Sequence, residues 1–124
     1  MRDLVLIDTS IWIDFLHGEK SAGPVKSLLE ENLASTHILI ESELRSGSIK
    51  DRDAFFYFLS RLPQISVIDY SIVFQLIEKE KLYGKGLSFI DIALYASAKA
   101  DRIKIWTNDR KLSDLCRKAG LLYE

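Results

Sequence analysis

The sequence has 124 residues, of which 48% are hydrophobic and 28% are charged, with only 2 prolines and 6 glycines. This length and composition predict one ordered globular domain over residues 1–124 and exclude a largely disordered chain. The formal net charge is −1, which counts weakly against a nucleic-acid partner, because such domains are usually basic. A cluster of acids that holds cations would also lower the formal charge.

The single cysteine, Cys116, cannot form an internal disulfide and suits a reducing compartment. No segment approaches the roughly 20 apolar residues that a membrane span needs. The N-terminal apolar run also lacks the basic region, long apolar core and small-residue cleavage site of a signal peptide. We therefore expect a cytoplasmic protein with no membrane association.

The first predicted element is a strand made of four successive aliphatic residues, Leu4-Val5-Leu6-Ile7. A strand with one wet face would alternate apolar and polar residues, so this run indicates burial on both faces. Asp8 follows at once, and a helix over 10–17 then closes on Gly18. Asp8 therefore lies in a strand-to-helix turn, at the edge where open α/β sheets bind ligands.

Strands and helices alternate along the rest of the chain. We expect helices at 24–31, 40–47, 52–62, 70–83, 92–100 and 110–119, a loop at 19–23, and strands at 34–39, 65–68, 103–106 and 121–123. Ser88 and Asp91 resemble a capping box at the start of the helix over 92–100. Because parallel neighbours need helical crossovers, the alternation predicts a three-layer α/β/α fold with a central, mainly parallel sheet.

Two predicted strands end on similar acidic segments, Ile-Asp-Thr at 7–9 and Thr-Asn-Asp at 107–109. The ends of parallel strands point to one edge of the sheet, so Asp8 and Asp109 could meet there. The alternative is that each aspartate only caps the helix that follows it, since Asp is a favoured N-cap residue. Spacing alone does not choose between the two interpretations.

Four ordered blocks resemble the PIN-domain ribonucleases of the VapC toxin type. They are Asp-Thr-Ser-Ile-Trp-Ile-Asp-Phe-Leu at 8–16, Glu-Leu-Arg-Ser-Gly at 43–47, Asp-Ile-Ala-Leu-Tyr-Ala at 91–96 and Thr-Asn-Asp-Arg at 107–110. Each block is weak alone, but four in the right order and spacing are specific. The resemblance implies a PIN-like fold, an acidic quartet that holds Mg²⁺ or Mn²⁺ (Asp8, Glu43, Asp91 and Asp109), and four residues that shape its surroundings (Thr9, Ser10, Thr107 and Asn108).

A divalent metal ion would explain why four carboxylates gather in one site. Like charges in a shared site raise one another's pKa unless a cation intervenes. Mg²⁺ prefers oxygen ligands, and a bound divalent ion supplies hydroxide near neutral pH and neutralises phosphodiester charge. The chemistry predicts metal-dependent hydrolysis, and the resemblance implies an endoribonuclease toxin that leaves a 5′-phosphate and a 3′-hydroxyl.

Two positions of the quartet have alternatives, and one neighbouring position departs from the family pattern. Glu41 competes with Glu43, but residues two apart on a helix point in different directions, and the Glu-Leu-x-x-Gly pattern favours Glu43. Asp91 could instead be a first-turn acid favoured by the helix dipole. Members of the family often have another acid two residues after the last aspartate of the quartet, where this sequence has Lys111.

The resemblance also implies three partners: an RNA substrate, a VapB-type antitoxin and a second copy of the chain in a homodimer. The positions next to the acidic blocks supply candidates for contacts with RNA phosphates, namely Arg45, Lys85, Arg110 and Lys111. The helix over 52–62 is apolar around most of its circumference, with Phe55, Phe56 and Phe58. We expect it to contribute to the dimer or antitoxin interface.

Two other functions compete with the nuclease. A haloacid-dehalogenase-type phosphatase also starts from an aspartate after the first strand, but it needs a second acid two residues later, where this sequence has Ser10. A catalytically silent PIN-like module for metal or protein binding would keep the same acids. His17 and His37 have no metal-ligand spacing, and Cys116 is expected to be a small buried apolar residue.

Overall fold

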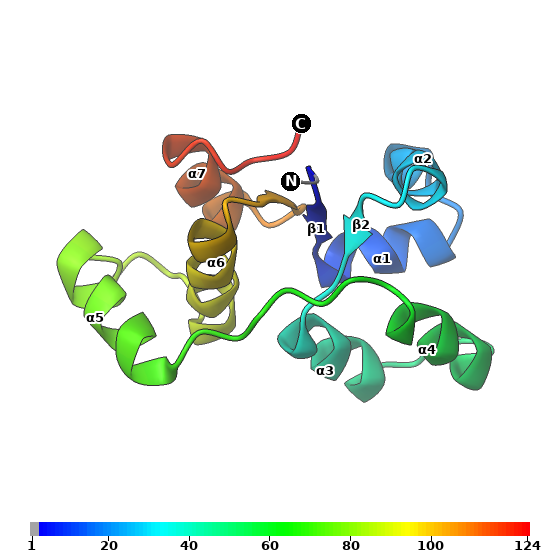
Figure 1. Cartoon of the computed structure of the whole chain (residues 1–124), viewed down its shortest axis with the longest axis horizontal. Coiled ribbons are helices and arrows are strands. Elements are labelled where there is room, and N and C mark those ends of the chain that lie inside the picture. Colours follow the sequence, from blue (N-terminus) through cyan, green and yellow to red (C-terminus); the bar gives the residue numbers. More distant parts are fainter. Residues whose placement is uncertain (1–2) are drawn as a thin grey trace.

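The computed structural model describes residues 3–124 and is an α/β fold, as expected (Figure 1). Its strands are β1 (Val5–Ile7), β2 (Ala34–Ser35) and β3 (Lys104–Trp106). Its α-helices are α1 (Thr9–Leu16), α2 (Pro24–Glu30), α3 (Ile38–Ser46), α4 (Arg52–Ser60), α5 (Tyr70–Glu80), α6 (Phe89–Asp101) and α7 (Arg110–Lys118), with a short 3₁₀ helix, η1 (Lys20–Ala22). In this part of the chain no helix is long and apolar enough to cross a membrane.

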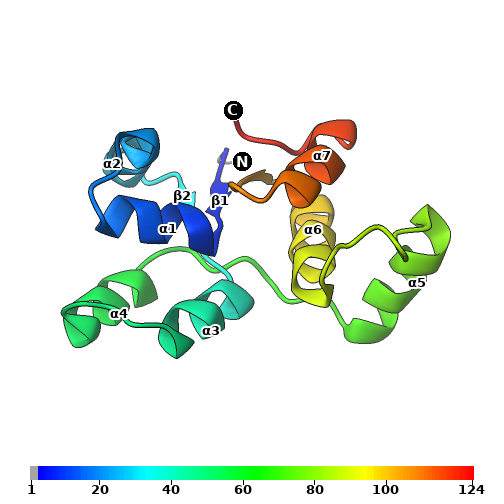
Figure 2. The same cartoon turned by 180° about the vertical axis from the view of Figure 1, so that it is seen from behind.

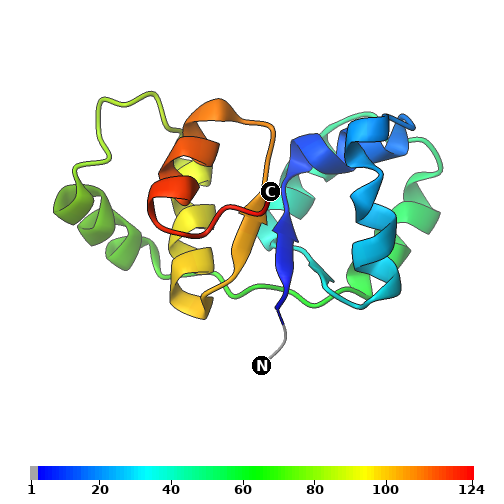
Figure 3. The ribbon, with the colours of Figure 1, turned by 90° about the horizontal axis from the view of Figure 1, so that it is seen from above.

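The three strands form a parallel sheet in the order β2-β1-β3. Val5 in the central strand is paired with Ala34 on one side and Lys104 on the other. Because the strands are parallel, β1 and β3 end at the same edge of the sheet, and α1 and α7 begin there (Figure 3). This shared edge is where the sequence places Asp8 and the segment 107–109.

Helices lie on both sides of the sheet. Helices α5, α6 and α7 lie on one side, and α1 to α4 lie on the other (Figures 1 and 2). Trp12 of α1 is fully buried, and its ring meets those of Phe15, Phe55 and Phe58 edge to face, at centroid distances of 6.3, 6.0 and 6.3 Å. Edge-to-face geometry is favourable for aromatic rings, so this cluster holds α4 against α1.

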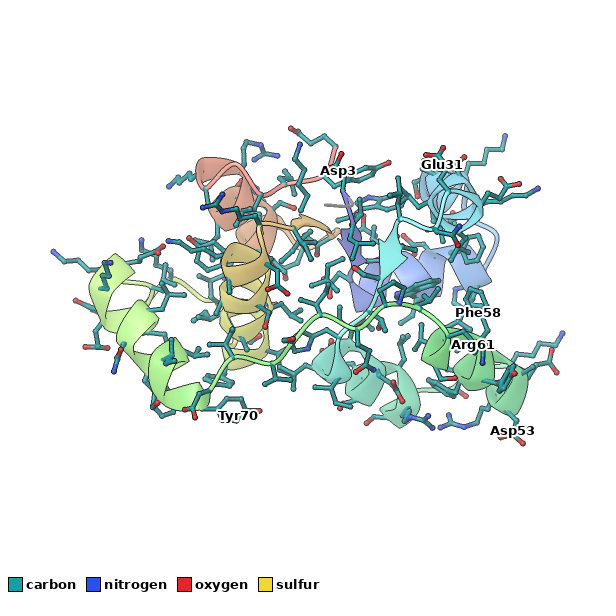
Figure 4. The ribbon with its side chains drawn as sticks, viewed as in Figure 1. Asp3, Glu31, Asp53, Phe58, Arg61 and Tyr70 are labelled. Atoms are coloured by element: carbon teal, nitrogen blue, oxygen red, sulfur yellow. The ribbon has the colours of Figure 1, made fainter. Side chains whose placement is uncertain are left out.

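The aromatic helix α4 is only partly covered by the rest of the chain. Phe55 and Phe56 are buried, whereas Tyr57 is 69% and Phe58 is 37% exposed. Phe58 lies on the side of α4 that faces α1 (Figure 4). The internal core therefore accounts for two of the three phenylalanines, and Tyr57 and part of Phe58 remain on the surface.

Three of the predicted strands are wrong or shorter than expected. The strand predicted at 34–39 ends at Ser35, because the His37 ring accepts the Leu39 amide and starts α3 at Ile38. With β2 so short, the segment 65–68 has no strand to extend and retains only a bridge from Gln64 to Thr36. The segment 121–123 likewise forms a single parallel bridge, Leu122 to Ile105, instead of a strand.

The predicted helices are confirmed, with differences at their ends. The capping box at Ser88 starts α6 at Phe89, earlier than the predicted 92–100, because Ser88 is the N-cap and the helix begins directly after it. Helix α5 ends at Glu80 because Lys81 adopts a left-handed conformation there, so the predicted 70–83 is too long. The predicted loop at 19–23 contains the single turn η1.

Candidate active site

Asp8 lies at the end of β1 and is only 8% exposed. Its Oδ1 accepts a hydrogen bond from the Thr9 amide at 2.8 Å, and its Oδ2 accepts one from the Thr107 hydroxyl at 2.6 Å. Its own amide donates to the Trp106 carbonyl at 2.9 Å, across to β3. Both β1 and β3 therefore fix the position of this carboxylate.

The electrostatic surroundings of Asp8 raise its pKa above the usual value. Burial is the main cause, and the hydrogen bonds from Thr107 and Thr9 oppose it by lowering the pKa. The negative charges of Glu43 and Asp91 raise it further. Acids from α3 and α6 thus act on the buried acid at the end of β1, and a cation at this point would relieve all three.

Glu43 and Glu41 point to different surroundings on α3. The Thr9 hydroxyl donates to Glu43 Oε1 at 2.7 Å, which ties Glu43 to the start of α1 next to Asp8. Glu41 instead forms an ion pair with Arg45 at 2.7 Å, and the Arg45 guanidinium lies over the Phe56 ring at 4.3 Å from its centroid. This geometry favours Glu43 as the acid of the site and engages the charge of Arg45 elsewhere.

Asp8 and Asp109 are joined through the hydroxyl of Thr107. That hydroxyl donates to Asp8 and also accepts the Asp109 amide at 3.0 Å. Asp109 is at the same time the N-cap of α7, because its Oδ1 accepts the Leu112 amide at 2.8 Å. The capping interpretation therefore holds for Asp109, and the bond to Thr107 joins its backbone amide to the Asp8 site. A carboxylate has about four acceptor sites and a cap uses one, so the Asp109 carboxylate keeps acceptor sites for a cation.

Asp91 belongs to the capping box of α6. Its Oδ2 accepts the Ser88 amide at 3.2 Å, and its own amide donates to the Ser88 hydroxyl at 3.1 Å. Asp91 is thus a first-turn acid and is also close enough for its charge to raise the pKa of Asp8. The buried thiol of Cys116 also lies near these acids. Burial and the charges of Asp8 and Asp91 raise the pKa of this thiol to about 12.

The segment after β3 is held against α1 by Asn108. The Asn108 amide donates to the Ser10 hydroxyl at 3.2 Å, and its side-chain Nδ2 donates to Asp14 Oδ2 at 2.8 Å. Sequence reasoning missed Asp14. The signal that could have found it is the four-residue spacing from Ser10, which places both side chains on one face of a helix. These bonds position the loop that carries Asp109.

The acids fit a hard divalent cation by their chemistry. All four candidates offer carboxylate oxygens, which Mg²⁺ and Mn²⁺ prefer. Within residues 3–124, however, no three acidic, histidine or cysteine side chains already form a metal-binding group. Glu43 and Asp109 are exposed, and each carboxylate accepts one hydrogen bond, from the Thr9 hydroxyl and the Leu112 amide, which leaves further oxygen lone pairs for a cation.

The histidines lie outside the site. The His37 ring is fully buried, with Nε2 at 3.0 Å from the Ser97 hydroxyl and Nδ1 accepting the Leu39 amide at 3.1 Å. His17 is exposed at the end of α1. Both have the packing or surface role that the sequence indicated.

Comparison with known proteins identifies the family. The family model of the PIN domain matches residues 5–118 of this chain. This chain belongs to the PIN-domain family. This chain is 34% identical over 119 residues to Ribonuclease VapC32 from two strains of Mycobacterium tuberculosis. The match covers 95% of this chain and 94% of the relative. The resemblance seen in the four sequence blocks is therefore confirmed.

Two solved structures share the PIN-domain fold. A toxin–antitoxin complex from Klebsiella pneumoniae matches with a TM-score of 0.64 and 22% identity, covering 85% of this chain and 86% of that one. PAE2754 from Pyrobaculum aerophilum matches with a TM-score of 0.57 and 16% identity, covering 90% of this chain and 83% of that one. At these identities the likeness concerns the fold alone.

Proposed function

We propose that this chain is a metal-dependent endoribonuclease, the toxin of a type II toxin–antitoxin system. In this proposal the acidic quartet binds the metal and catalyses the hydrolysis of RNA phosphodiester bonds. Its members are Asp8, Glu43, Asp91 and Asp109. The observation that carries it is the buried Asp8 carboxylate, whose pKa is raised by burial and by the charges of two further acids of the quartet. The likeness to Ribonuclease VapC32 over 95% of the chain supports the reaction and the substrate class.

Mg²⁺ or Mn²⁺ would supply charge neutralisation and an activated water molecule at this edge. The residues around the quartet then have positioning roles. Thr107 and the Thr9 amide fix both oxygens of Asp8, and the Thr9 hydroxyl orients Glu43. Ser10 and Asn108 hold the Asp109 loop against α1. Such surrounding groups commonly change metal affinity or activity by about 10–100-fold when removed.

The RNA substrate would pass over this edge with its phosphates near positive side chains. Lys85, Arg110 and Lys111 are exposed, and in the sequence they lie near the start of α6, which contains Asp91, and the start of α7, which Asp109 caps. Arg45 is the weakest of the four phosphate-contact candidates, because Glu41 and the Phe56 ring already engage its guanidinium. The ring and the ion pair would have to release Arg45 before it reached a phosphate.

The proposal includes an antitoxin protein and a second copy of this chain as partners. The toxin–antitoxin complex from Klebsiella pneumoniae and the VapC name of the relative support the antitoxin. The homodimer rests on the family resemblance and on exposed apolar side chains, which include Tyr57 and Phe58 of α4. The proposed cytoplasmic location rests on the single free cysteine, which suits a reducing compartment.

The proposed function is tested with the purified, antitoxin-free chain and a mixed RNA substrate, with and without Mg²⁺ or Mn²⁺. We expect cleavage only with metal, products bearing 5′-phosphates, and at least about 100-fold slower cleavage by Asp8→Asn. Asp53→Asn, an exposed aspartate on α4, is the matched control and should cleave like the wild type. Equal cleavage by Asp8→Asn would reject the mechanism.

The silent binding module is the second candidate. It keeps the same four acids, and the exposed apolar side chains Tyr57 and Phe58 of α4 offer a surface for a protein partner without any cleavage chemistry. It predicts that Mg²⁺ or Mn²⁺ raises the melting temperature of the wild type, but not of Asp8→Asn, while neither protein cleaves any RNA in the mixture. Cleavage by the wild type but not by Asp8→Asn excludes this candidate.

A further inference from the structure

A pocket of about 200 Å³ lies between α7 and the loop that joins α5 to α6. Its walls carry three lysines, Lys85, Lys111 and Lys118, and three leucines (Leu82, Leu87 and Leu115). Figure 2 shows this loop passing beside α7 before it enters α6. The pocket thus combines three positive charges with an apolar lining.

The lysine charges are not neutralised by the chain itself. Within residues 3–124 none of the three ammonium groups forms an ion pair with a carboxylate. Asp114 also lines the pocket, but its Oδ1 accepts from Arg117 Nη1 at 3.0 Å. Three like charges that line one pocket repel one another, and the chain as a whole has a net charge of −1. An anionic ligand would remove this repulsion.

The local backbone directs the lysines into the pocket. Lys111 and Lys118 are seven residues apart on α7 and so lie on one face of the helix. Lys85 stands between Gly84 and Gly86, which adopt left-handed conformations with φ of +70° and +78°. The Lys111 side chain lies across Gly86, where a Cβ would overlap its ammonium group. A Cβ at 86 would therefore force the flexible end of the Lys111 side chain to move.

The pocket adjoins the candidate active site through both of its walls. Gly86 lies two residues before Ser88, the cap of the helix whose first turn contains Asp91. Lys111 lies two residues after Asp109. The contact between Lys111 and Gly86 consequently joins the two segments that carry these acids. A polymer bound across the acidic edge would continue toward this pocket.

We infer that the pocket of Lys85, Lys111 and Lys118 binds a backbone phosphate of the RNA substrate, away from the bond that is cleaved. This inference rests on the proposed function for its ligand. Lysine binds phosphate as a point charge without reading the base, so the pocket would position the strand rather than select its sequence. The Lys111 that replaces the acid common in the family then serves substrate binding.

The test measures binding of a labelled single-stranded oligoribonucleotide by fluorescence anisotropy in EDTA, over a range of salt concentrations. The triple variant Lys85→Gln, Lys111→Gln, Lys118→Gln should weaken binding by about tenfold at low salt. The slope of log affinity against log salt should fall by about 0.7 for each phosphate that the variant no longer neutralises. A matched triple variant, Lys20→Gln, Lys26→Gln, Lys104→Gln, removes three exposed lysines elsewhere and should change both quantities much less.

Two glycine variants distinguish the effect of moving Lys111 from the effect of backbone strain. Gly86→Ala should displace Lys111 and weaken RNA binding, whereas Gly84→Ala has the same left-handed strain with nothing within 4 Å of the added Cβ and should bind like the wild type. Equal binding by the two alanine variants, or equal effects of the two triple variants, would overturn the proposal that this pocket binds a phosphate. Circular dichroism melting of each variant confirms that it is folded at the assay temperature.

The outcomes separate the pocket from the proposed function. Metal-dependent cleavage by the wild type with unchanged binding by the lysine triple variant rejects the pocket and keeps the nuclease. Lysine-dependent binding without cleavage under any metal keeps the pocket and rejects the nuclease. Equal weakening of RNA binding and of binding to an acidic peptide of the same charge by the triple variant would also overturn the inference, because it would show that the lysines attract any polyanion instead of holding a backbone phosphate.

Discussion

The Thr107 hydroxyl donates to the Asp8 carboxylate at 2.6 Å across the ends of β3 and β1. Thr107→Val keeps the shape of the side chain and removes this donor, leaving a buried carboxylate oxygen without its partner. We expect RNA cleavage to fall by about 10–100-fold and the free energy of unfolding to fall by about 1–3 kcal/mol. Cleavage kinetics and urea unfolding measure the two effects.

Two controls accompany this change. Thr107→Ser keeps the hydroxyl and should retain most of the activity. Thr36→Val replaces a buried threonine whose hydroxyl has no hydrogen-bond partner within the described residues, and it should leave stability and cleavage nearly unchanged. Full activity of Thr107→Val would show that the orientation of Asp8 does not depend on this bond.

The two acids of α3 should differ in their effect on cleavage. Glu43→Gln removes a charge that acts on Asp8 and is expected to slow cleavage by at least about tenfold. Glu41→Gln breaks only a partly exposed ion pair with Arg45, worth about 1 kcal/mol or less, and should cleave at close to the wild-type rate. The comparison of the two rates at saturating Mg²⁺ decides between them. A larger loss for Glu41→Gln would show that Glu41, and not Glu43, is the acid of the site.

Metal should stabilise the fold through Asp8. The buried Asp8 carboxylate is repelled by Glu43 and Asp91, and a divalent cation would reverse this repulsion. A Mg²⁺ concentration about 100-fold above the dissociation constant should add about 2.7 kcal/mol to the free energy of unfolding. The melting temperature with Mg²⁺ or with EDTA measures the shift, and Asp8→Asn should lose it. An unchanged melting temperature of the wild type would argue against a metal site.

Mild acid should destabilise the protein through His37. Burial lowers the pKa of His37 below its usual value, and the neutral ring caps α3. The unfolded chain therefore binds a proton below about pH 6.5 that the native chain does not, so stability falls as the pH drops from there toward the lowered native pKa. The contribution is at most about 1.4 kcal/mol per pH unit.

Melting temperatures between pH 5 and 7.5 test this dependence. His37→Asn should flatten the loss of stability below about pH 6.5, whereas His17→Asn, at an exposed position, should follow the wild type. Parallel pH profiles for the wild type and His37→Asn would show that another group is responsible.

Cys116 should not react in the native protein. Its side chain is fully buried, and burial with the charges of Asp8 and Asp91 raises the pKa of the thiol to about 12. Because the thiolate is the reactive form, a disulfide reagent at pH 8 should modify the folded chain far more slowly than the guanidinium-unfolded chain. Similar rates for the two states would mean that the helix α7 opens readily.

Local sequence signals determined most of the fold. The aliphatic run 4–7 predicted a buried strand, and the residues Ser88 and Asp91 predicted the capping box of α6, although the helix begins at Phe89 and not at 92, because both signals depend on residues close in the chain. The alternation of strands and helices predicted the parallel sheet, and four short blocks predicted the family. The strand expected at 65–68 failed because a strand needs a partner, and β2 ends too early to provide one.

The arrangement of the site was decided only by tertiary structure. Periodicity could not tell that Glu43 reaches Thr9 while Glu41 pairs with Arg45, nor that one hydroxyl, Thr107, serves both Asp8 and Asp109. It also gave no sign that Lys111 lies across Gly86. Most of these contacts join segments far apart in the chain, and their distances depend on how the sheet and helices pack, which local residue preferences do not determine.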